Sequence, residues 1–196
     1  MSFAKPIFVT LVCRRLAAMV RQLSGMVSAL ALLLLMPGIA LSQMEAGNEA
    51  AVKVAFLYNF FKFIDWPQNV GDTDEFRLCF SSPDAFGETL TALQGKSVND
   101  KPLSIVRSIS PKELKTCHML FISADDNPAS YLRQLKNLQV VSVSDQAGFV
   151  DKGGILGLVR DGNRLAFEIN LDAAQTQGLH ISAQLLKLAK TVADSP

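Results

Sequence analysis

Apolar side chains in residues 51–67 (AVKVAFLYNFFKFIDWP) lie all around the helix that their spacing predicts, instead of along one stripe. Val52 and Phe56 fall on one side, and Leu57 and Ile64 cover the other. Such a helix is either a core element, or it packs both on its own fold and on a partner. It is expected to end before Pro67, because a proline pushes the preceding residue out of helical geometry. The candidate partner-binding residues are Tyr58, Phe60, Phe61 and Trp66.

If the helix does present a partner-binding face, one of its three central aromatic side chains should be substantially exposed. These side chains are Tyr58, Phe60 and Phe61. If all three are buried, the helix is a core element and a partner surface lies elsewhere.

Short apolar runs bounded by turn residues predict four strands, at residues 76–81, 103–109, 119–123 and 140–144. Helical spacing with a start and a stop signal follows two of them, at residues 82–95 and 128–138. Strands that alternate with helix-length segments favour a parallel α/β core with right-handed crossovers.

The pattern changes near the end of the chain. Residues 153–158 and 164–171 flank Asp161-Gly162, which predicts an antiparallel hairpin. A short helix should then run from a cap at Asn170 or Asp172 to Gly178, and a last helix from Ser182 should place Leu188 and Val192 on the core. The sequence therefore predicts one α/β domain, with a mostly parallel central sheet flanked by helices and an antiparallel hairpin at the C-terminal end.

Residues 1–42 have the pattern of a secretory signal peptide. They hold four basic and no acidic residues, then an apolar run and small residues before a cut that we place between Ser42 and Gln43. An uncleaved membrane anchor is the alternative, but the apolar run is short of the roughly 20 residues that a span requires. The basic region is long, so translation could start at Met19 instead of Met1. The domain proper would then be residues 43–196.

Removal of this leader changes the charge of the chain. The whole chain has 19 basic and 18 acidic residues, so the loss of four basic ones leaves 15 against 18, a net charge of −3. Nucleic-acid binders concentrate Lys and Arg on one face, so a nucleic-acid partner is not expected. No apolar run in residues 43–196 is long enough to span a bilayer, so we expect the mature protein to be soluble.

Two cysteines remain after the leader, Cys79 and Cys117, and both lie in the expected buried strand regions. An even number of cysteines in an exported chain predicts a disulfide. Two free buried thiols are the alternative.

No residues assemble a convincing active site, cofactor site or metal site. The Gly153–Gly157 run (GGILG) enters a strand instead of a helix, so a strand bulge explains it better than a phosphate-binding loop. His118 and His180 are far apart, and His118 reads as a hydrogen-bonded residue near the cysteine pair. Glu168 is either solvated at the end of the sheet or a buried acceptor. We therefore expect no enzyme.

Several segments in this order resemble the YfiR family of small periplasmic regulators, over residues 49–192. They are VKVAFLYNFFKFIDWP, RLCF, TCHMLFIS, GGILGLV and RLAFEINLDAAQTQGLHISAQLLKLAKTV. The resemblance implies a disulfide between Cys79 and Cys117. Some members carry a second cysteine pair in the C-terminal half, and this chain has none there.

The resemblance also implies a function and partners. YfiR-like proteins repress an inner-membrane diguanylate cyclase by binding its periplasmic part, and an outer-membrane lipoprotein can titrate them away, which raises cyclic di-GMP and favours biofilm formation. A second copy of the chain is a further candidate partner. The competing hypothesis is a periplasmic small-molecule binding module, with its pocket at the C-terminal ends of the parallel strands near residues 81–84 and 123–127.

Overall fold

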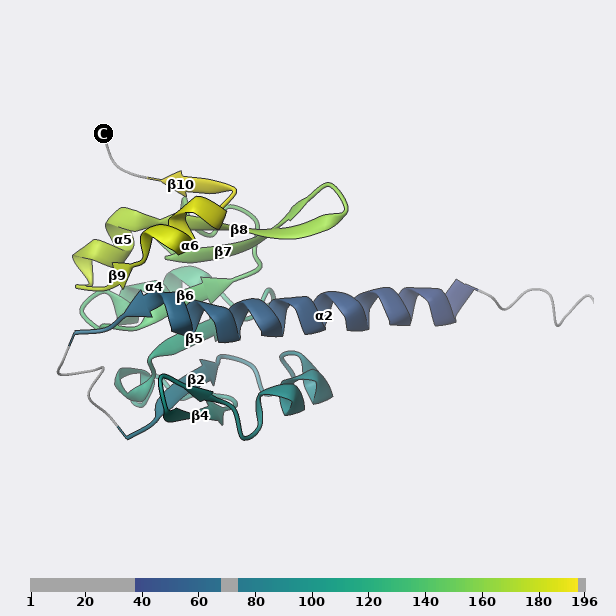
Figure 1. The fold of residues 1–196 in the computed structure, drawn as a ribbon, viewed down its shortest axis with the longest axis horizontal. Helices are drawn as coiled ribbons and strands as arrows, with labels where there is room; N and C mark the ends of the chain where they lie inside the picture. Colours follow the sequence, from purple (N-terminus) through teal and green to yellow (C-terminus); the bar gives the residue numbers. More distant parts are fainter. Residues whose placement is uncertain (1–37, 68–73, 194–196) are drawn as a thin grey trace, which may run out of the picture. The chain divides into compact units, whose positions relative to one another are not determined.

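The computed structural model describes residues 38–67 and 74–193. The chain divides into two compact units, residues 1–46 and residues 47–196, and the second unit holds the sheet shown in Figure 1. Most of the predicted signal peptide, residues 1–42, lies outside the described residues. Its cleavage after Ser42 and the start at Met1 or Met19 therefore stay predictions.

One eight-stranded sheet forms the centre of the domain. Its spatial order is β10-β8-β7-β6-β5-β2-β4-β3. The strands are β2 (Phe76–Phe80), β3 (Ser97–Val98), β4 (Lys101–Val106), β5 (Met119–Ile122), β6 (Val141–Ser144), β7 (Leu156–Asp161), β8 (Arg164–Asn170) and β10 (Thr191–Ala193).

The strand directions confirm the predicted fold class. Five neighbours, β4, β2, β5, β6 and β7, run parallel. Then β8 returns antiparallel to β7 as the expected hairpin, and β3 pairs antiparallel with β4 at the other edge. The central strands β5 and β6 are buried at all four positions, as strands covered on both faces of a parallel sheet should be.

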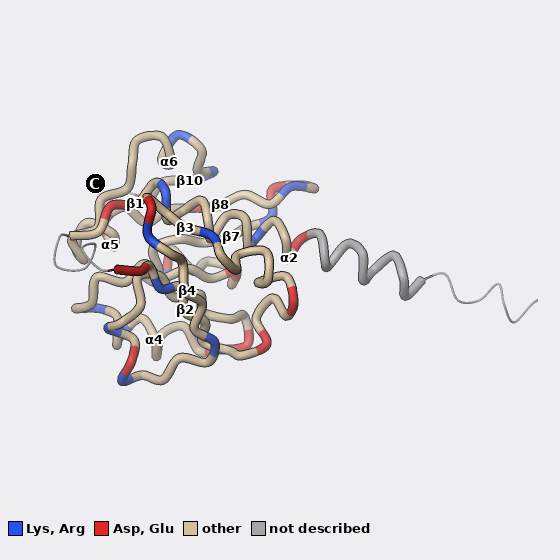
Figure 2. The backbone as a smooth tube through the Cα atoms, turned by 60° about the horizontal axis from the view of Figure 1, so that its bottom comes forward, with Lys and Arg blue, Asp and Glu red and all other residues tan. Residues whose placement is uncertain are grey.

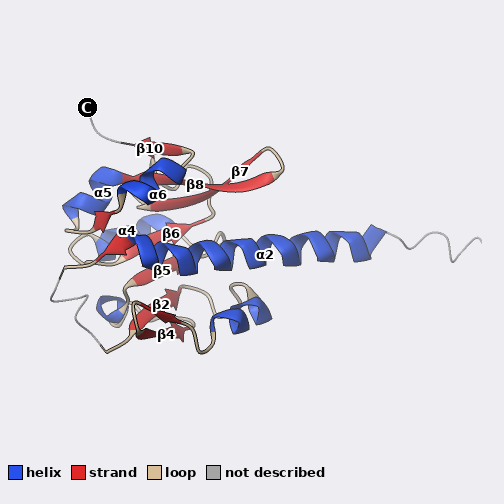
Figure 3. Ribbon diagram, in the orientation of Figure 1, coloured by secondary structure: helices blue, strands red, loops and turns tan. Residues whose placement is uncertain are grey.

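Helices cover both faces of the sheet (Figure 3). One face packs against α2 (Gly38–Phe63), α5 (Leu171–Thr176), α6 (Ala183–Leu188) and the 3₁₀ helix η1 (Gly87–Leu93). The other face packs against α4 (Pro128–Leu135) and the short 3₁₀ helix η2 (Leu114–Thr116). Alternation along the strands supplies both cores: Phe121 of β5 joins the first, and Leu120 and Ile122 join the second.

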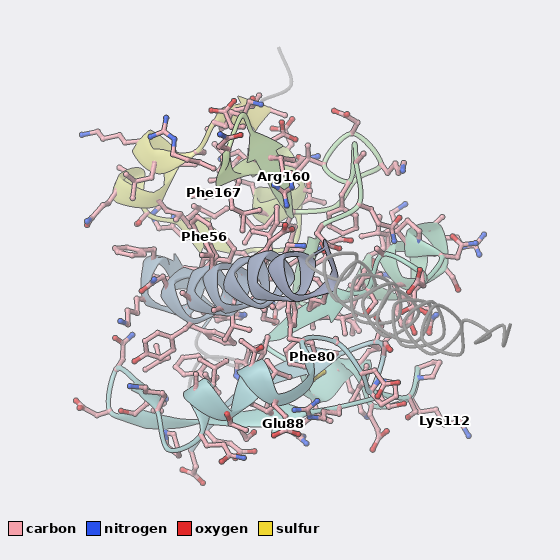
Figure 4. All side chains as sticks on the ribbon, turned by 90° about the vertical axis from the view of Figure 1, so that its right-hand side faces the viewer. Phe56, Phe80, Glu88, Lys112, Arg160 and Phe167 are labelled. Atoms are coloured by element: carbon pink, nitrogen blue, oxygen red, sulfur yellow. A yellow bond between two sulfur atoms is a disulfide. The ribbon has the colours of Figure 1, made fainter. Side chains whose placement is uncertain are left out.

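The opening helix α2 is a core element over much of its described surface. Phe60 and Phe61 are fully buried on two sides of it, and Leu57 is buried as well. In Figure 4, Phe56 of α2 and Phe167 of β8 lie close together, and their ring centroids are 5.5 Å apart. The expected burial follows from the all-round apolarity of this segment. The exposed stripe is narrow and includes Val52 and Asn59.

Three expectations about helices and the hairpin loop were wrong. Residues 82–95 do not form an α-helix but a bend and the 3₁₀ helix η1, preceded by Phe86 in the left-handed conformation (φ 60°). The hairpin loop is Gly162-Asn163 instead of Asp161-Gly162, because Asp161 pairs with Arg164. The last helix ends at Leu188, which is 63% exposed instead of docked, and the chain continues into β10 beside β8.

A small second sheet was not predicted. The chain leaves α2 at Phe63 and immediately forms β1 (Ile64–Asp65), which pairs antiparallel with β9 (His180–Ile181). The backbone N–H of Ser182 also donates to the Phe63 carbonyl over 2.9 Å. This pairing joins the end of the opening helix to the C-terminal segment.

Candidate functional site

The four candidate partner-binding residues divide into two pairs. Phe60 and Phe61 have no exposed surface, so neither side chain offers contact area to a partner in this structure. Tyr58 and Trp66 are half-buried. The Tyr58 hydroxyl donates to the Ser97 carbonyl over 2.9 Å, and the exposed Lys62 ammonium lies 4.2 Å from the centroid of its ring.

Trp66 packs where the opening helix ends. Its ring stacks on Phe61 with centroids 5.5 Å apart, and its Nε1–H donates to the backbone carbonyl of His118 over 3.2 Å. His118 is buried, and its Nδ1 accepts the backbone N–H of Arg77 over 3.1 Å. The expectation of a hydrogen-bonded histidine beside the cysteine pair is therefore confirmed.

The predicted disulfide between Cys79 and Cys117 is present. It joins β2 to the residue just before His118, across 38 residues of sequence, with a Cα–Cα distance of 5.9 Å. Both cysteines are fully buried in the core beneath α4 and η2. The bridge therefore fastens the strand pair β2–β5 from the face opposite α2.

Charged side chains link α2 to the sheet. Lys53 Nζ lies 2.6 Å from Asp145 Oδ2 and 2.9 Å from Glu49 Oε1, and Glu49 also pairs with Arg160 of β7. Burial alone would lower the pKa of Lys53, but its bonds to Asp145 and Glu49 outweigh burial and raise that pKa. The hydrogen bond from Lys53 lowers the pKa of Glu49.

The strand order creates a crevice at the carboxyl ends of β2 and β5. The chain leaves β2 toward β4 on one side, and it leaves β5 toward β6 on the other. Open α/β sheets bind ligands where successive connections diverge in this way. This crevice coincides with the pocket expected near residues 81–84 and 123–127.

Hydrogen bonds brace the loops on either side of the crevice. Ser81 Oγ donates to Asp126 Oδ2 over 2.6 Å and accepts the backbone N–H of Ser123 over 2.9 Å. Gln146 Nε2 donates to the carbonyls of Ser123 and Asp126 over 3.0 and 2.9 Å. Three loops that follow β2, β5 and β6 are thereby held together, so the crevice is a built feature of the fold.

A cavity of about 210 Å³ opens in this crevice. Three aspartates line it, one after each of the strands β2, β5 and β6: Asp84, Asp125 and Asp145. None of the described residues that line it is basic. The sequence analysis placed the loops of Asp84 and Asp125 at the pocket but missed Asp145. Asp145 follows β6, and nothing in the local sequence indicates that the end of β6 lies beside the ends of β2 and β5.

Aromatic and serine side chains complete the cavity wall. Phe86 and Phe121 line it with ring centroids 4.7 Å apart. Ser123 and Asp145 each carry one buried side-chain oxygen, Oγ and Oδ1, that has no hydrogen-bond partner. A buried polar atom without a partner loses free energy, so such atoms call for an explanation.

A second and larger hollow lies at the β4 side of the sheet. It has a volume of about 520 Å³ and is lined by Leu90, Gln94, Gly95, Leu103, Ile105 and Arg107. The guanidinium of Arg107 is already committed there, since it donates to the carbonyls of Pro83 and Gly87 over 3.1 and 3.0 Å. Arg107 therefore links the end of β4 to the segment that carries η1, and it is the one charged side chain among the described residues that line this hollow.

The glycine run before β7 has a packing explanation. Gly153 lies in a turn, so the expected strand bulge was wrong, and a Cβ on Gly154 would lie 2.1 Å from the buried ring of Phe149. Glu168 is half-buried on the face of β8 opposite Phe167. Among residues 38–67 and 74–193, no three His, Cys, Asp or Glu side chains gather as metal ligands.

Charge and hydropathy add two observations on the described part of the chain. Basic and acidic positions are interspersed along the backbone in Figure 2, with no stripe of one sign. None of the described helices is long and apolar enough to cross a membrane.

Comparisons with known proteins match this domain. A family model described as YfiR/HmsC-like matches residues 50–190. The chain is also similar to two solved structures, the ABC domain in complex with L-Trp from Streptococcus pneumonia (13% identity, TM-score 0.43) and a conserved domain protein from Vibrio cholerae (12% identity, TM-score 0.46). Each match covers 64% of this chain and 57% of the other, so the chain spans little more than half the length of these structures.

Proposed function

The chain belongs to the YfiR/HmsC-like family, and we propose that it is a periplasmic regulatory protein that binds and represses an inner-membrane diguanylate cyclase. The observation that carries this proposal is the family match over residues 50–190, which extends from the opening helix to the end of α6. The buried disulfide between Cys79 and Cys117 suits a protein of an oxidising compartment. The chain acts by binding, without catalysing a reaction of its own.

The partner of this protein is the periplasmic part of the cyclase, and an outer-membrane lipoprotein competes for it. Tyr58 and Trp66 are the contact candidates that retain exposed surface. Aromatic residues of this kind supply much of the binding energy in protein interfaces. A second copy of the chain is a further candidate partner of the same surface.

Deletion of the gene tests the regulatory role. Cellular cyclic di-GMP should rise when the gene is deleted and return when the wild-type gene is restored. Unchanged cyclic di-GMP in a strain that expresses a membrane diguanylate cyclase would contradict the proposal.

A pair of matched variants tests the surface. The chain has two tyrosines, Tyr58 on α2 and Tyr131 on α4, and both are half-buried. Tyr58→Ala should weaken capture of the periplasmic part of the cyclase by about tenfold or more, the effect of an interface anchor, whereas Tyr131→Ala on the other face of the sheet should not. Equal capture by both variants would place the partner surface elsewhere.

The second candidate function, a small-molecule binding module, is supported by one specific observation. A cavity lined by aspartate, serine and phenylalanine residues lies at the point in the sheet where α/β proteins bind ligands. The two functions are compatible, because a ligand can tune an interaction.

A further inference from the structure

We propose that an extended peptide segment of a partner protein adds a strand to the sheet along β4, places an apolar side chain in the hollow beside that strand and pairs a carboxylate with Arg107. Three features carry this inference: the uncovered half of the β4 edge, the hollow next to it and the charge of Arg107. The binding is measured on the protein alone, so the proposal does not depend on repression of a cyclase.

The edge strand β3 covers only the first half of β4. It pairs with Lys101 and Pro102, whereas β4 continues to Val106 at the bottom of the sheet in Figure 1. β3 is short because the chain before it comes from η1 through a turn at Gly95, where φ is +69°. Residues 104–106 therefore form the outer edge of the sheet themselves.

This half of β4 presents backbone groups that no described residue binds. The Leu103 N–H donates to the Lys96 carbonyl over 2.9 Å, so the backbone of Leu103 faces away from β2. Backbone direction alternates along a strand, and the N–H and C=O of Ile105 therefore face outward as well. No hydrogen bond from another residue of the described ranges reaches these two groups. An edge of this kind is a template for a further strand.

The hollow lies along this edge, between β4 and η1. Leu103 and Ile105 line it from β4, and Leu90 lines it from η1. Alternate side chains of an added strand would lie beside Leu103 and Ile105 and point to the same face of the sheet. The volume of about 520 Å³ has room for a large apolar side chain of the peptide, which would cover the half-buried Ile105.

Arg107 selects for a carboxylate on the bound peptide. Its guanidinium lines the hollow on the same face as Ile105. Of its five N–H donors, one donates to the Pro83 carbonyl and one to the Gly87 carbonyl. The other donors suit a carboxylate, which arginine binds in a planar fork. Because Ile105 and Arg107 are two positions apart, the acid of the peptide should lie two positions from its apolar residue.

The acids near Arg107 do not neutralise it. Asp84 and Glu88 follow Pro83 and Gly87 in the sequence, but among the described residues neither carboxylate forms an ion pair with Arg107. Both are exposed, so solvent screens them. Lys96 is also exposed and adds a positive charge beside Leu103.

A second copy of the chain fits this edge less well than a peptide does. Two copies paired antiparallel about Ile105 would place residues 101–103 of one copy opposite residues 107–109 of the other. β3 lies on that side of residues 101–103, so it would occupy the position of residues 107–109 of the other copy. Those residues still follow β2, because the Ile109 N–H donates to the Phe80 carbonyl. The uncovered edge is therefore too short for symmetric pairing.

Selection from a phage-displayed library of random linear peptides on the purified protein, with its disulfide intact, tests the proposal. The enriched peptides should share a large apolar residue two positions from an aspartate, a glutamate or the C-terminal carboxylate. Their synthetic forms should bind saturably with one site per chain. A selection that enriches no such spacing would overturn the proposal.

Two substitutions of Ile105 test the backbone contact with the enriched peptides. Ile105→Pro removes the outward N–H, and a proline is tolerated on an edge strand where its nitrogen faces solvent. It should weaken peptide binding by about tenfold or more, whereas Ile105→Val keeps the N–H and should leave the affinity unchanged. Urea denaturation checks that both proteins are folded. Equal peptide affinity of the two variants would overturn the proposal.

Hydrogen exchange of the wild-type protein tests the edge without any substitution. In the free protein the Ile105 amide should exchange much faster than the Leu103 amide, and bound peptide should slow the exchange of Ile105. Protection of Ile105 in the free protein would show that the edge is already covered and would overturn the proposal.

A matched pair of arginine variants tests the charge. Arg107→Gln should weaken peptide binding by about tenfold and reduce its dependence on salt. Arg133→Gln removes an equally exposed charge on α4, on the other face of the sheet, and should change neither. Equal losses in both variants would mean that only the net charge of the protein matters. Sedimentation of the wild type as a dimer that Ile105→Pro abolishes would assign the edge to a second copy, which would also overturn the proposal.

Discussion

Lys53 is the side chain that ties the opening helix to the rest of the domain. It lies on α2, yet it contacts Asp145 at the end of β6, and through Glu49 it reaches Arg160 on β7. Asp145 also lines the crevice cavity. One salt-bridged network therefore connects α2, the central sheet and the candidate ligand site.

Because of this network, the free energy of unfolding should depend on pH in the acid range. The pKa of Glu49 lies below its ordinary value of 4.5, so its ion pairs stabilise the fold above that pH, and the contribution is lost as the pH falls through the folded-state pKa. Glu49→Gln should lower the free energy of unfolding at pH 7 by up to about 1 kcal/mol, because the pair is partly exposed. At pH 3 the two proteins should be nearly equal. Urea denaturation at both pH values measures the difference, and an equal difference at both would contradict the assignment.

The disulfide should be the largest stabilising contribution of any single residue pair. A bridge across 38 residues contributes roughly 4 kcal/mol in the chain-entropy model. Cys79→Ala with Cys117→Ala should therefore lower the free energy of unfolding by about this amount. Urea denaturation with and without dithiothreitol gives the measurement: the reductant should destabilise the wild type and leave the double variant unchanged. A decrease in the free energy of unfolding of less than about 1 kcal/mol would show that the core is stable without the bridge.

Residues with a local role were the ones that the sequence could identify. The cysteine pair and the capping residues Asn170 and Ser182 act within a few residues or through an obligatory partner, and the structure confirms them. The pair of Lys53 and Asp145 spans 92 residues, so no local pattern could indicate it. Phe86 lies within residues 82–95, which were expected to be helical, and its left-handed conformation has no sequence signal in a bulky residue.

At the scale of elements, α2 illustrates how an all-round apolar segment is accommodated. Its two sides pack on different rings, since Phe60 contacts Phe167 of β8 and Phe61 contacts Phe76 of β2. The helix therefore bridges the two halves of the same sheet face. A hydrophobic pattern predicts burial of this kind, but it does not identify which strands supply the contacts.

Adjacent substitutions on α2 should differ sharply in their effect. Phe60→Ala removes a fully buried ring and should cost about 3–5 kcal/mol, the range for a large-to-small change in a core. Asn59→Ala changes an exposed position one residue away and should shift stability by less than about 0.5 kcal/mol. Thermal and urea unfolding of both variants measure the contrast. Similar stability of the two proteins would mean that α2 does not dock on the sheet as described.

Elements that depend on distant pairing were the ones that the sequence missed. β1, β9 and β10 are two or three residues long and exist because a partner strand lies beside them. Val192 was expected on the face of a helix, but it pairs with Ile169 in β10. Strands this short have no alternation long enough to detect, so tertiary pairing decides their structure.

At the scale of the whole molecule, alternating strands and helices were sufficient for the fold class but not for the order of strands. Nothing local distinguishes the observed neighbours, in which β2 lies between β4 and β5, from other parallel orders. The order matters for function, because it alone places the crevice between β2 and β5. The sequence predicted the position of the pocket only because polar residues follow the ends of the predicted strands.

Each edge of the sheet is formed by a short strand, which covers a longer strand beside it. β3 closes one edge with two residues, and β10 covers the other with three, pairing with Glu168, Ile169 and Asn170 of β8. Without β10, the seven-residue strand β8 would become the edge of the sheet. Long unpaired edges are templates for association with another chain.

A truncation after Leu188 should therefore promote self-association. It removes β10 together with the hydrogen bond of 2.8 Å from the Lys190 backbone N–H to the Phe167 carbonyl. Sedimentation velocity at several protein concentrations should show larger species than for a control truncated after Ala193, which keeps β10 intact. Circular dichroism should confirm that both proteins retain their helices, since the first core does not use β10 residues. Identical sedimentation of the two proteins would show that the exposed edge of β8 is protected by other means.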